Sequence, residues 1–316
     1  MQPSARWPGR LATMGAELAL TPARLLRPLA VPLLSPLASP VRHNVHRGIR
    51  RSFGQDGGNG SQAGRTDRSG TPFLPHGSVT RRIHGDLPSM VIGGISTLLL
   101  QTLHPLVMAG VADHSHYRED PIGRFRRTAA FVDATTFGTT DDAQRAIDNV
   151  RLVHAMISGT SPDGRPYSAG DPDLLTWVHV AETWTFLRAA ERYGPRRLSQ
   201  EERDRYFAET AQIALALGAE WVPTTEAEAE AYFSRLRPHL YAGAQALEAR
   251  DFLLRGVARH PEDRAVYALM VAAAVGLLPD WARRELKIPS PPLTDRVVVR
   301  PLVRGLCTGI RWATLA

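Results

Sequence analysis

Cysteine and lysine are almost absent from this chain of 316 residues. Cys307 is the single cysteine, so a disulfide within the chain and a zinc site made of cysteines are both excluded, and a reducing compartment is expected. Of the 38 lysine and arginine residues, only Lys287 is lysine. Because 43% of the residues are hydrophobic, the chain still has ample material for a buried core.

Several motifs that define common enzyme classes are also missing. The chain contains no GxGxxG and no GxxxxGKS/T, which argues against nucleotide binding through the usual glycine-rich loops. It contains no HExxH, CxxC or GxSxG, so ordinary zinc hydrolases, zinc ribbons and α/β-hydrolases find no support. The chemistry therefore has to be sought in other residues.

The positive charge is concentrated at the N-terminal end. Residues 1–85 contain 12 arginines and three acidic residues, a local net charge of +9, so the remainder carries about −2 of the total of +7. Residues 1–72 are rich in Pro, Arg and Gly, and we predict a flexible basic extension and linker there. No nucleic-acid-binding module accompanies this charge, so we expect a solvated tail without a nucleic-acid partner, with peripheral membrane contact as the alternative.

Helical patterns dominate residues 73–316, which we predict to form one all-α domain of about eight to ten helices. The most apolar stretch, residues 89–112, has the length of a membrane helix. Polar Gln101 and His104, followed by Pro105, favour a buried core helix that is broken at the proline. Capping signals predict four further helix starts, at Thr139-x-x-Asp142, Asp171-Pro172, Ser199-x-x-Glu202 and Thr225-x-x-Glu228.

His154 lies in an apolar helical pattern. It shares one helix face with the apolar residues Ile147, Val150 and Ile157. Two interpretations stay open: a core histidine whose ring is satisfied by a neighbour, or a ligand of a group outside the chain. His179 is similar, because Glu182 lies three residues later and is placed to orient its ring.

The segment ADHSHYRED, residues 112–120, contains an H-x-H pair, His114 and His116. With its acidic neighbours this pair is a candidate for holding non-haem iron. The alternative interpretation is a polar helix end with solvated imidazoles.

The segment GRFRRTAAFVDATTFG, residues 123–138, places Arg124, Arg127 and Thr128 on one face of a predicted helix. Two cations and a hydroxyl beside an apolar stripe suit an anionic or polarisable ligand inside the fold. A surface arginine face is the alternative that this pattern leaves open.

Residues 73–194 resemble the MpaB/latex-clearing-protein family of oxygenases. The matching segments, in order, are FLPHGSVTRRIHGD, QTLHPLVMAGVADHSHY, GRFRRTAAFVDATTFG, the His154 segment and GRPYSAGDPDLLTWVHV. The resemblance implies an all-α fold with a globin-like haem-binding core. It also implies a b-type haem whose iron activates dioxygen to cleave isoprenoid carbon–carbon double bonds.

The resemblance further suggests which histidines bind the cofactor. His154 matches the axial ligand of the haem iron, and His179 is the second candidate for that position. His114 is expected to line the distal side of the haem. A neutral imidazole in a dry apolar pocket is what such a ligand requires.

On the distal side, Arg124, Arg127 and Thr128 match the Arg-x-x-Lys-Thr element of the rubber-cleaving relatives. Arg127 replaces the lysine, and an arginine cannot lose its proton, so we expect it to hydrogen-bond bound dioxygen or to pair with a haem propionate. Glu119 is the nearest candidate for the catalytic glutamate of those enzymes.

We therefore predict a haem b-dependent oxygenase that uses O2 on a small, apolar, isoprenoid-like alkene. The alternatives are a non-catalytic haem- or lipid-binding helical protein, and non-haem iron at His114 and His116. The sequence identifies no electron donor. We expect the protein to be cytoplasmic, with peripheral association with a membrane as the alternative.

Overall fold

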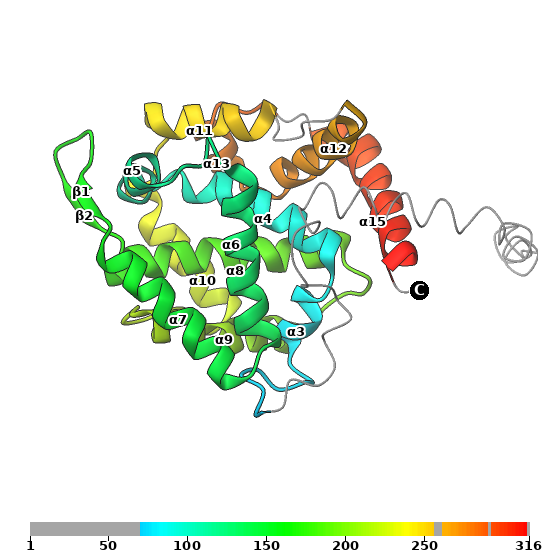
Figure 1. Cartoon of the computed structure of the whole chain (residues 1–316). Coiled ribbons are helices and arrows are strands. Elements are labelled where there is room, and N and C mark those ends of the chain that lie inside the picture. The colour runs from blue at the N-terminus through cyan, green and yellow to red at the C-terminus, as the bar shows by residue number, and fades with distance from the viewer. Residues whose placement is uncertain (1–69, 256–260, 290–291, 315–316) are drawn as a thin grey trace, which may run out of the picture. The chain divides into compact units, whose positions relative to one another are not determined.

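The computed structural model describes residues 70–255, 261–289 and 292–314, so the predicted basic extension lies outside the described residues except for its last positions. Helices form most of the described chain (Figure 1), which confirms the all-α class. Its one sheet is a short antiparallel pair, β1 (Ser158–Thr160) and β2 (Pro166–Ser168), which the sequence patterns did not predict.

The helices, in chain order, are α3 (Val79–His84), α4 (Leu87–Gln101), α5 (Pro105–His114), α6 (Pro121–Phe137), α7 (Thr140–Ala155), α8 (Pro172–Tyr193), α9 (Gln200–Leu217), α10 (Glu226–Leu236), α11 (Ala244–Arg255), α12 (Pro261–Leu277), α13 (Asp280–Glu285), α14 (Pro292–Thr294) and α15 (Arg300–Thr314). A 3-10 turn, η3 (Arg237–His239), follows α10, and a π-helical turn, η4 (Asp295–Val299), precedes α15.

Helices α4 and α8 pack along each other at the centre of the core. Leu99 and Leu100 of α4 and Trp177 and Leu187 of α8 are all fully buried in one apolar cluster. Close approach of the two helices depends on Gly93, where a methyl group would lie 2.6 Å from Cδ1 of Phe186. A glycine in a helix interior is intrinsically unfavourable, so here packing outweighs propensity.

The apolar stretch predicted over residues 89–112 is broken as expected. Helix α4 ends at Gln101, α5 begins at Pro105, and the two helices are bent by 105°. Proline fits the first turn of α5 because its missing N–H has no intrahelical partner there. Among the described helices, none alone has the length and apolarity to cross a bilayer, and α4 with α5 reaches that length only as this bent pair.

Side chains cap the predicted helix starts. Capping boxes begin α7 and α9, and the Asp171 carboxylate accepts backbone N–H groups at the start of α8. Thr225 caps α10 by accepting from the Glu228 N–H, but the box does not close. The Glu228 carboxylate instead accepts from the Thr224 N–H, at 2.7 Å. The helix starts are therefore local in origin, as the sequence indicated.

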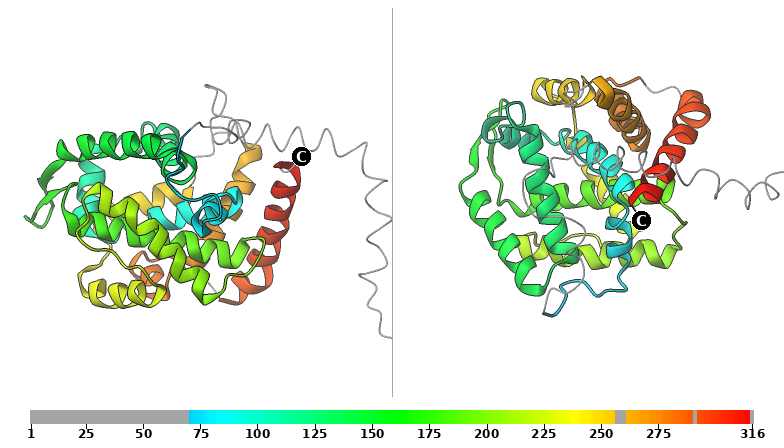
Figure 2. Two further views of the ribbon diagram at one scale, coloured as in Figure 1. Left: turned by 90° about the horizontal axis from the view of Figure 1, so that it is seen from below. Right: turned by 45° about the vertical axis from the view of Figure 1, so that its right-hand side comes forward.

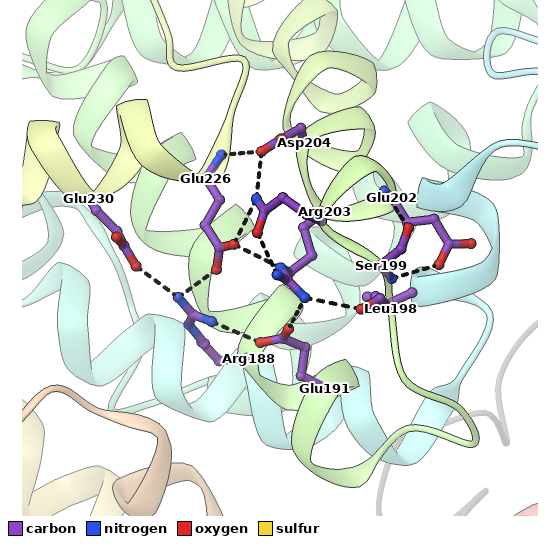
Figure 3. Close-up of polar contacts among 10 residues, drawn as sticks. Arg188, Glu191, Leu198, Ser199, Glu202, Arg203, Asp204, Glu226 and Glu230 are labelled. Carbon is purple, nitrogen blue, oxygen red and sulfur yellow. Dashed lines mark hydrogen bonds and ion pairs between the residues drawn. The ribbon is translucent and has the colours of Figure 1, made fainter.

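An ion-pair network fastens α10 to α8 and α9 (Figure 3). The Glu226 carboxylate, whose residue is 8% exposed, lies 2.7 Å from Nη2 of Arg188 and 2.8 Å from Nε of Arg203. The same two arginines also contact Glu191. Charged groups of both signs are thus paired where the three helices meet, which offsets the cost of removing them from water.

Helices α6 and α7 form a helical hairpin that crosses one side of α8 (Figures 1 and 2). The closed end of the hairpin is the end at which α6 leads into α7, between Phe137 and Thr140, and the opposite end is open. At the closed end α6 contacts α3 and α7 contacts α9. Thr135 and Thr136 of α6 and Ala143 and Ile147 of α7 are buried there. Towards the open end no residue of either helix is buried. The buried core therefore includes the closed end of the hairpin and not its open end.

Candidate functional site

His154 lies at the open end of the hairpin, on the stripe of α7 that faces the core. Ala143 and Ile147, one and two turns nearer the closed end, are fully buried on this stripe. Val150 and His154 continue it but are only half-buried. These four residues share one face of α7, so His154 lies on the helix face that is buried nearer the closed end. At His154 this face is only partly covered by other residues.

The ring of His154 has no hydrogen-bond or ion-pair partner within the described part of the chain, although its backbone carbonyl accepts from the Met156 and Ile157 N–H groups. Burial lowers the pKa of His154, so its neutral form is favoured. A neutral imidazole with an unused lone pair is the form that binds metal. The first interpretation from the sequence, a core histidine satisfied by a neighbour, finds no such neighbour in the residues described.

His179 and Glu182 lie one turn apart on α8, and both are half-buried. Burial lowers the pKa of His179 to about 4 and raises that of Glu182 to about 7. Burial therefore favours the neutral forms of both side chains. Nε2 of His179 lies 3.4 Å from the Thr183 hydroxyl. Within the described residues no hydrogen bond joins it to Glu182, so the expected orienting role of Glu182 is not supported.

The His84 ring joins α3 and α9 to the closed end of the hairpin. Nδ1 of His84 lies 2.8 Å from the Thr136 hydroxyl of α6, and its Nε2 lies 2.9 Å from the Tyr206 hydroxyl of α9. Burial lowers the pKa of His84 to about 3. Burial raises the pKa of Tyr206, and the charges of Glu182 and Glu209 raise it further.

The predicted arginine and threonine cluster on α6 does not converge on one point. Arg124 is half-buried, donates to the Ser115 hydroxyl and has a pKa that burial lowers. Arg127 is exposed and lies 3.4 Å from the exposed Asp120 carboxylate. Thr128 is exposed too, and its hydroxyl donates to the Arg124 carbonyl at 3.2 Å. Of the three residues, Arg124 is the one whose side chain is directed into the protein.

The H-x-H pair lies at the end of α5 and is exposed. Nε2 of His114 lies 3.2 Å from the Ser158 carbonyl of β1, and its ring meets the edge of the Tyr167 ring. Nδ1 of His116 lies 4.0 Å from Glu119. Among the described residues no three His, Cys, Asp or Glu side chains are grouped to hold a metal ion. The non-haem iron alternative therefore has no donor set there.

His84 and Tyr206 are the site residues that sequence reasoning missed. His84 is the last residue of α3, and its two partners lie 52 and 122 positions away in the chain. No local spacing indicates such a pairing, because the three residues belong to different helices.

Comparison with known protein families returned one match. A family model described as the catalytic domain of ER-bound oxygenase mpaB/B′ and rubber oxygenase matches residues 81–312. Searches of curated proteins and of solved structures gave no significant match. The matched region runs from α3 into α15 and contains every candidate site residue named above. The chain therefore belongs to the mpaB/rubber oxygenase catalytic-domain family, and it is an oxygenase.

Proposed function

We propose that this protein is a haem b-dependent oxygenase that uses O2 on an apolar, isoprenoid-like alkene. The observation that supports the proposal most is the state of His154. Its residue is half-buried, burial lowers the pKa of its imidazole, and the ring has no hydrogen-bond or ion-pair partner among the described residues. These are the properties that an axial ligand of haem iron needs.

The surroundings of His154 are compatible with a porphyrin. Val150 lies one turn before His154 on α7, and Ile157 follows the end of that helix; both are half-buried. Phe131 and Val132 of α6, one turn before the buried Thr135 and Thr136, are half-buried as well. Apolar side chains that are only partly covered by protein leave apolar surface for a flat apolar group to bury. When bound, haem would supply the redox chemistry of oxygen activation, and the protein would supply binding, orientation and exclusion of water.

Arg124 is the residue best placed to bind a haem propionate. Its guanidinium group is half-buried, and a partly desolvated cation attracts a carboxylate more strongly than an exposed one does. Arg127 is exposed beside Asp120, so we assign it to the rim and not to contact with bound oxygen. Thr128 would then act through the backbone carbonyl of Arg124, which its hydroxyl contacts.

The proposal is tested by the absorption spectrum of the protein produced with sufficient haem precursor. We expect a Soret band that His154→Ala abolishes. His179→Ala and His114→Ala are the matched histidine controls, and both should retain the band. A colourless wild-type protein that takes up no haemin would contradict the proposal. Loss of the band in His179→Ala alone would move the axial ligand to α8.

Oxygen consumption then tests turnover. Wild-type protein is incubated with a panel of prenylated alkenes, with and without an added reductant, so that a need for an electron donor is detected. Haem binding together with oxygen uptake would support the proposed oxygenase. Haem binding without uptake would favour the alternative from the sequence, a non-catalytic haem- or lipid-binding protein.

A further inference from the structure

Helix α15, at the C-terminal end of the described chain (Figure 1), has two apolar faces. Its inner face, with Val303, Cys307 and Ile310, is buried where α15 packs on α12, α4 and α8. The opposite face is exposed and carries Pro301, Leu302, Gly305, Thr308 and Gly309. The solvent side of a surface helix is normally polar and charged, whereas Thr308 is the one polar side chain of this set.

The exposed apolar surface continues into the turn that precedes α15. Leu293, Val297, Val298 and Leu302 are between 47% and 73% exposed. They form two pairs four residues apart, so they occupy successive turns of the helical segment. A methyl group at Gly305 or Gly309 would meet no atom of the described residues within 4 Å. Single exposed apolar side chains are ordinary, but a contiguous group of them marks a surface that binds a partner.

The charges beside this surface are positive. Asp295 is the one acidic residue between positions 292 and 314, and it is buried and lies 2.7 Å from Nη2 of Arg300. Arg296 and Arg304 are exposed, and within the described residues neither forms an ion pair. Nε of Arg304 donates to the Arg192 carbonyl, which holds its side chain at the edge of the surface. A second copy of the chain would bring these arginines against each other, so charge opposes self-association and favours an anionic partner.

We propose that residues 293–309 form a membrane-docking surface for a bilayer that contains anionic lipid. The aliphatic side chains would insert at the level of the headgroups, while Arg296 and Arg304 contact lipid phosphates. Aliphatic side chains on one helix face with arginines at its edge are typical of helices that lie in a membrane interface. The proposal is independent of haem and of the substrate at the His154 site. The sequence patterns assigned any membrane contact to the basic extension, residues 1–72, whereas this surface lies at the other end of the chain.

Cosedimentation of the full-length protein with lipid vesicles tests the proposal. One set of vesicles is phosphatidylcholine alone, and the other is phosphatidylcholine mixed with anionic phosphatidylglycerol. Wild-type protein should bind the anionic vesicles more strongly. Leu302→Asp should lower its partition coefficient on them about ten- to a hundredfold, because an inserted apolar side chain is replaced by a charge that the headgroups repel. Arg304→Gln should lower it about fivefold and leave binding to neutral vesicles unchanged.

Leu215→Asp is the matched control, because Leu215 is a leucine of α9 that is 48% exposed and lies outside the proposed surface. It should bind vesicles as wild type does. The basic residues 1–69 are present in every variant, so binding through them alone would leave Leu302→Asp equal to wild type and would overturn the proposal. Circular dichroism verifies folding, and Val298→Asp replaces Leu302→Asp if that variant unfolds. Sedimentation velocity without vesicles tests the other occupant: a wild-type dimer that Leu302→Asp dissociates would also overturn the proposal.

Discussion

Nε2 of His84 lies 2.9 Å from the Tyr206 hydroxyl, and this contact joins α3 to α9 across 122 positions of sequence. The other ring nitrogen reaches Thr136 at the end of α6. One neutral imidazole therefore holds three helices at the closed end of the α6–α7 hairpin.

Replacing His84 should destabilise the protein. His84→Leu leaves the buried Tyr206 and Thr136 hydroxyls without their ring partner, and we expect the free energy of unfolding to fall by about 2–3 kcal/mol. Tyr206→Phe removes one of the two contacts and should cost about half as much. Urea denaturation followed by circular dichroism measures both values. Equal stability of His84→Leu and wild type would show that the ring contacts contribute nothing.

Glu182 should make stability depend on pH. Burial raises its pKa from the ordinary 4.5 to about 7, so the folded state binds its proton more tightly than the unfolded state does. The free energy of unfolding should therefore fall as the pH rises from 4.5 to 7, and Glu182→Gln should remove this fall. We expect the variant to exceed wild type by up to about 3 kcal/mol at pH 8 and to equal it near pH 4.5.

The same experiment separates Glu182 from the nearby histidines. Burial lowers the pKa values of His84 and His179, so both rings cost stability as the pH falls below 6.5, which is the opposite direction. The difference between Glu182→Gln and wild type cancels their effect. A difference that does not change between pH 4.5 and 8 would contradict the raised pKa.

The glycine pair in α4 offers a matched test of core packing. A methyl group at Gly93 would lie 2.6 Å from Cδ1 and 3.2 Å from Cα of Phe186, so Gly93→Ala should force α4 and α8 apart and cost about 1–3 kcal/mol. At Gly94 the nearest atom of Phe186 is 3.9 Å away, an ordinary contact. Gly94→Ala should be neutral or stabilising by up to about 1 kcal/mol, because alanine favours the helix. Thermal melts of the two variants decide the sign of each effect.

Glu226 and Glu230 offer a matched test of the ion-pair network in Figure 3. Glu226→Ala removes the least exposed carboxylate of the network, which pairs with both Arg188 and Arg203, and we expect a loss of about 3 kcal/mol because two partly buried cations each lose one of their carboxylate partners. The side chain of Glu230 is 61% exposed, so Glu230→Ala should cost less than about 1 kcal/mol. Similar losses in the two variants would mean that burial of the pair does not matter.

Local structure was readable from the sequence wherever it depends on neighbouring residues. The capping box at Thr139 and Asp142, the proline after Asp171 and the break before Pro105 each act within a few residues, and each is found where it was predicted. The predicted capping box at Thr225 shows the limit of this reasoning. The Glu228 carboxylate accepts from the backbone N–H of Thr224 instead of that of Thr225, and the sequence pattern does not distinguish the two donors. The match to the mpaB/rubber oxygenase family likewise confirms what the ordered motifs of residues 73–194 indicated.

By itself, the sequence determined that the chain is all-α, where most helices begin, which family it belongs to, and that His154 lies on an apolar helix face. Only the tertiary structure decided that this face loses its covering beyond Ile147, that Arg127 lies at the surface while Arg124 turns inward, and that His84 joins three helices. The reason is physical: helix starts and faces follow from contacts a few residues apart, whereas burial and hydrogen-bond partners depend on which distant helices meet.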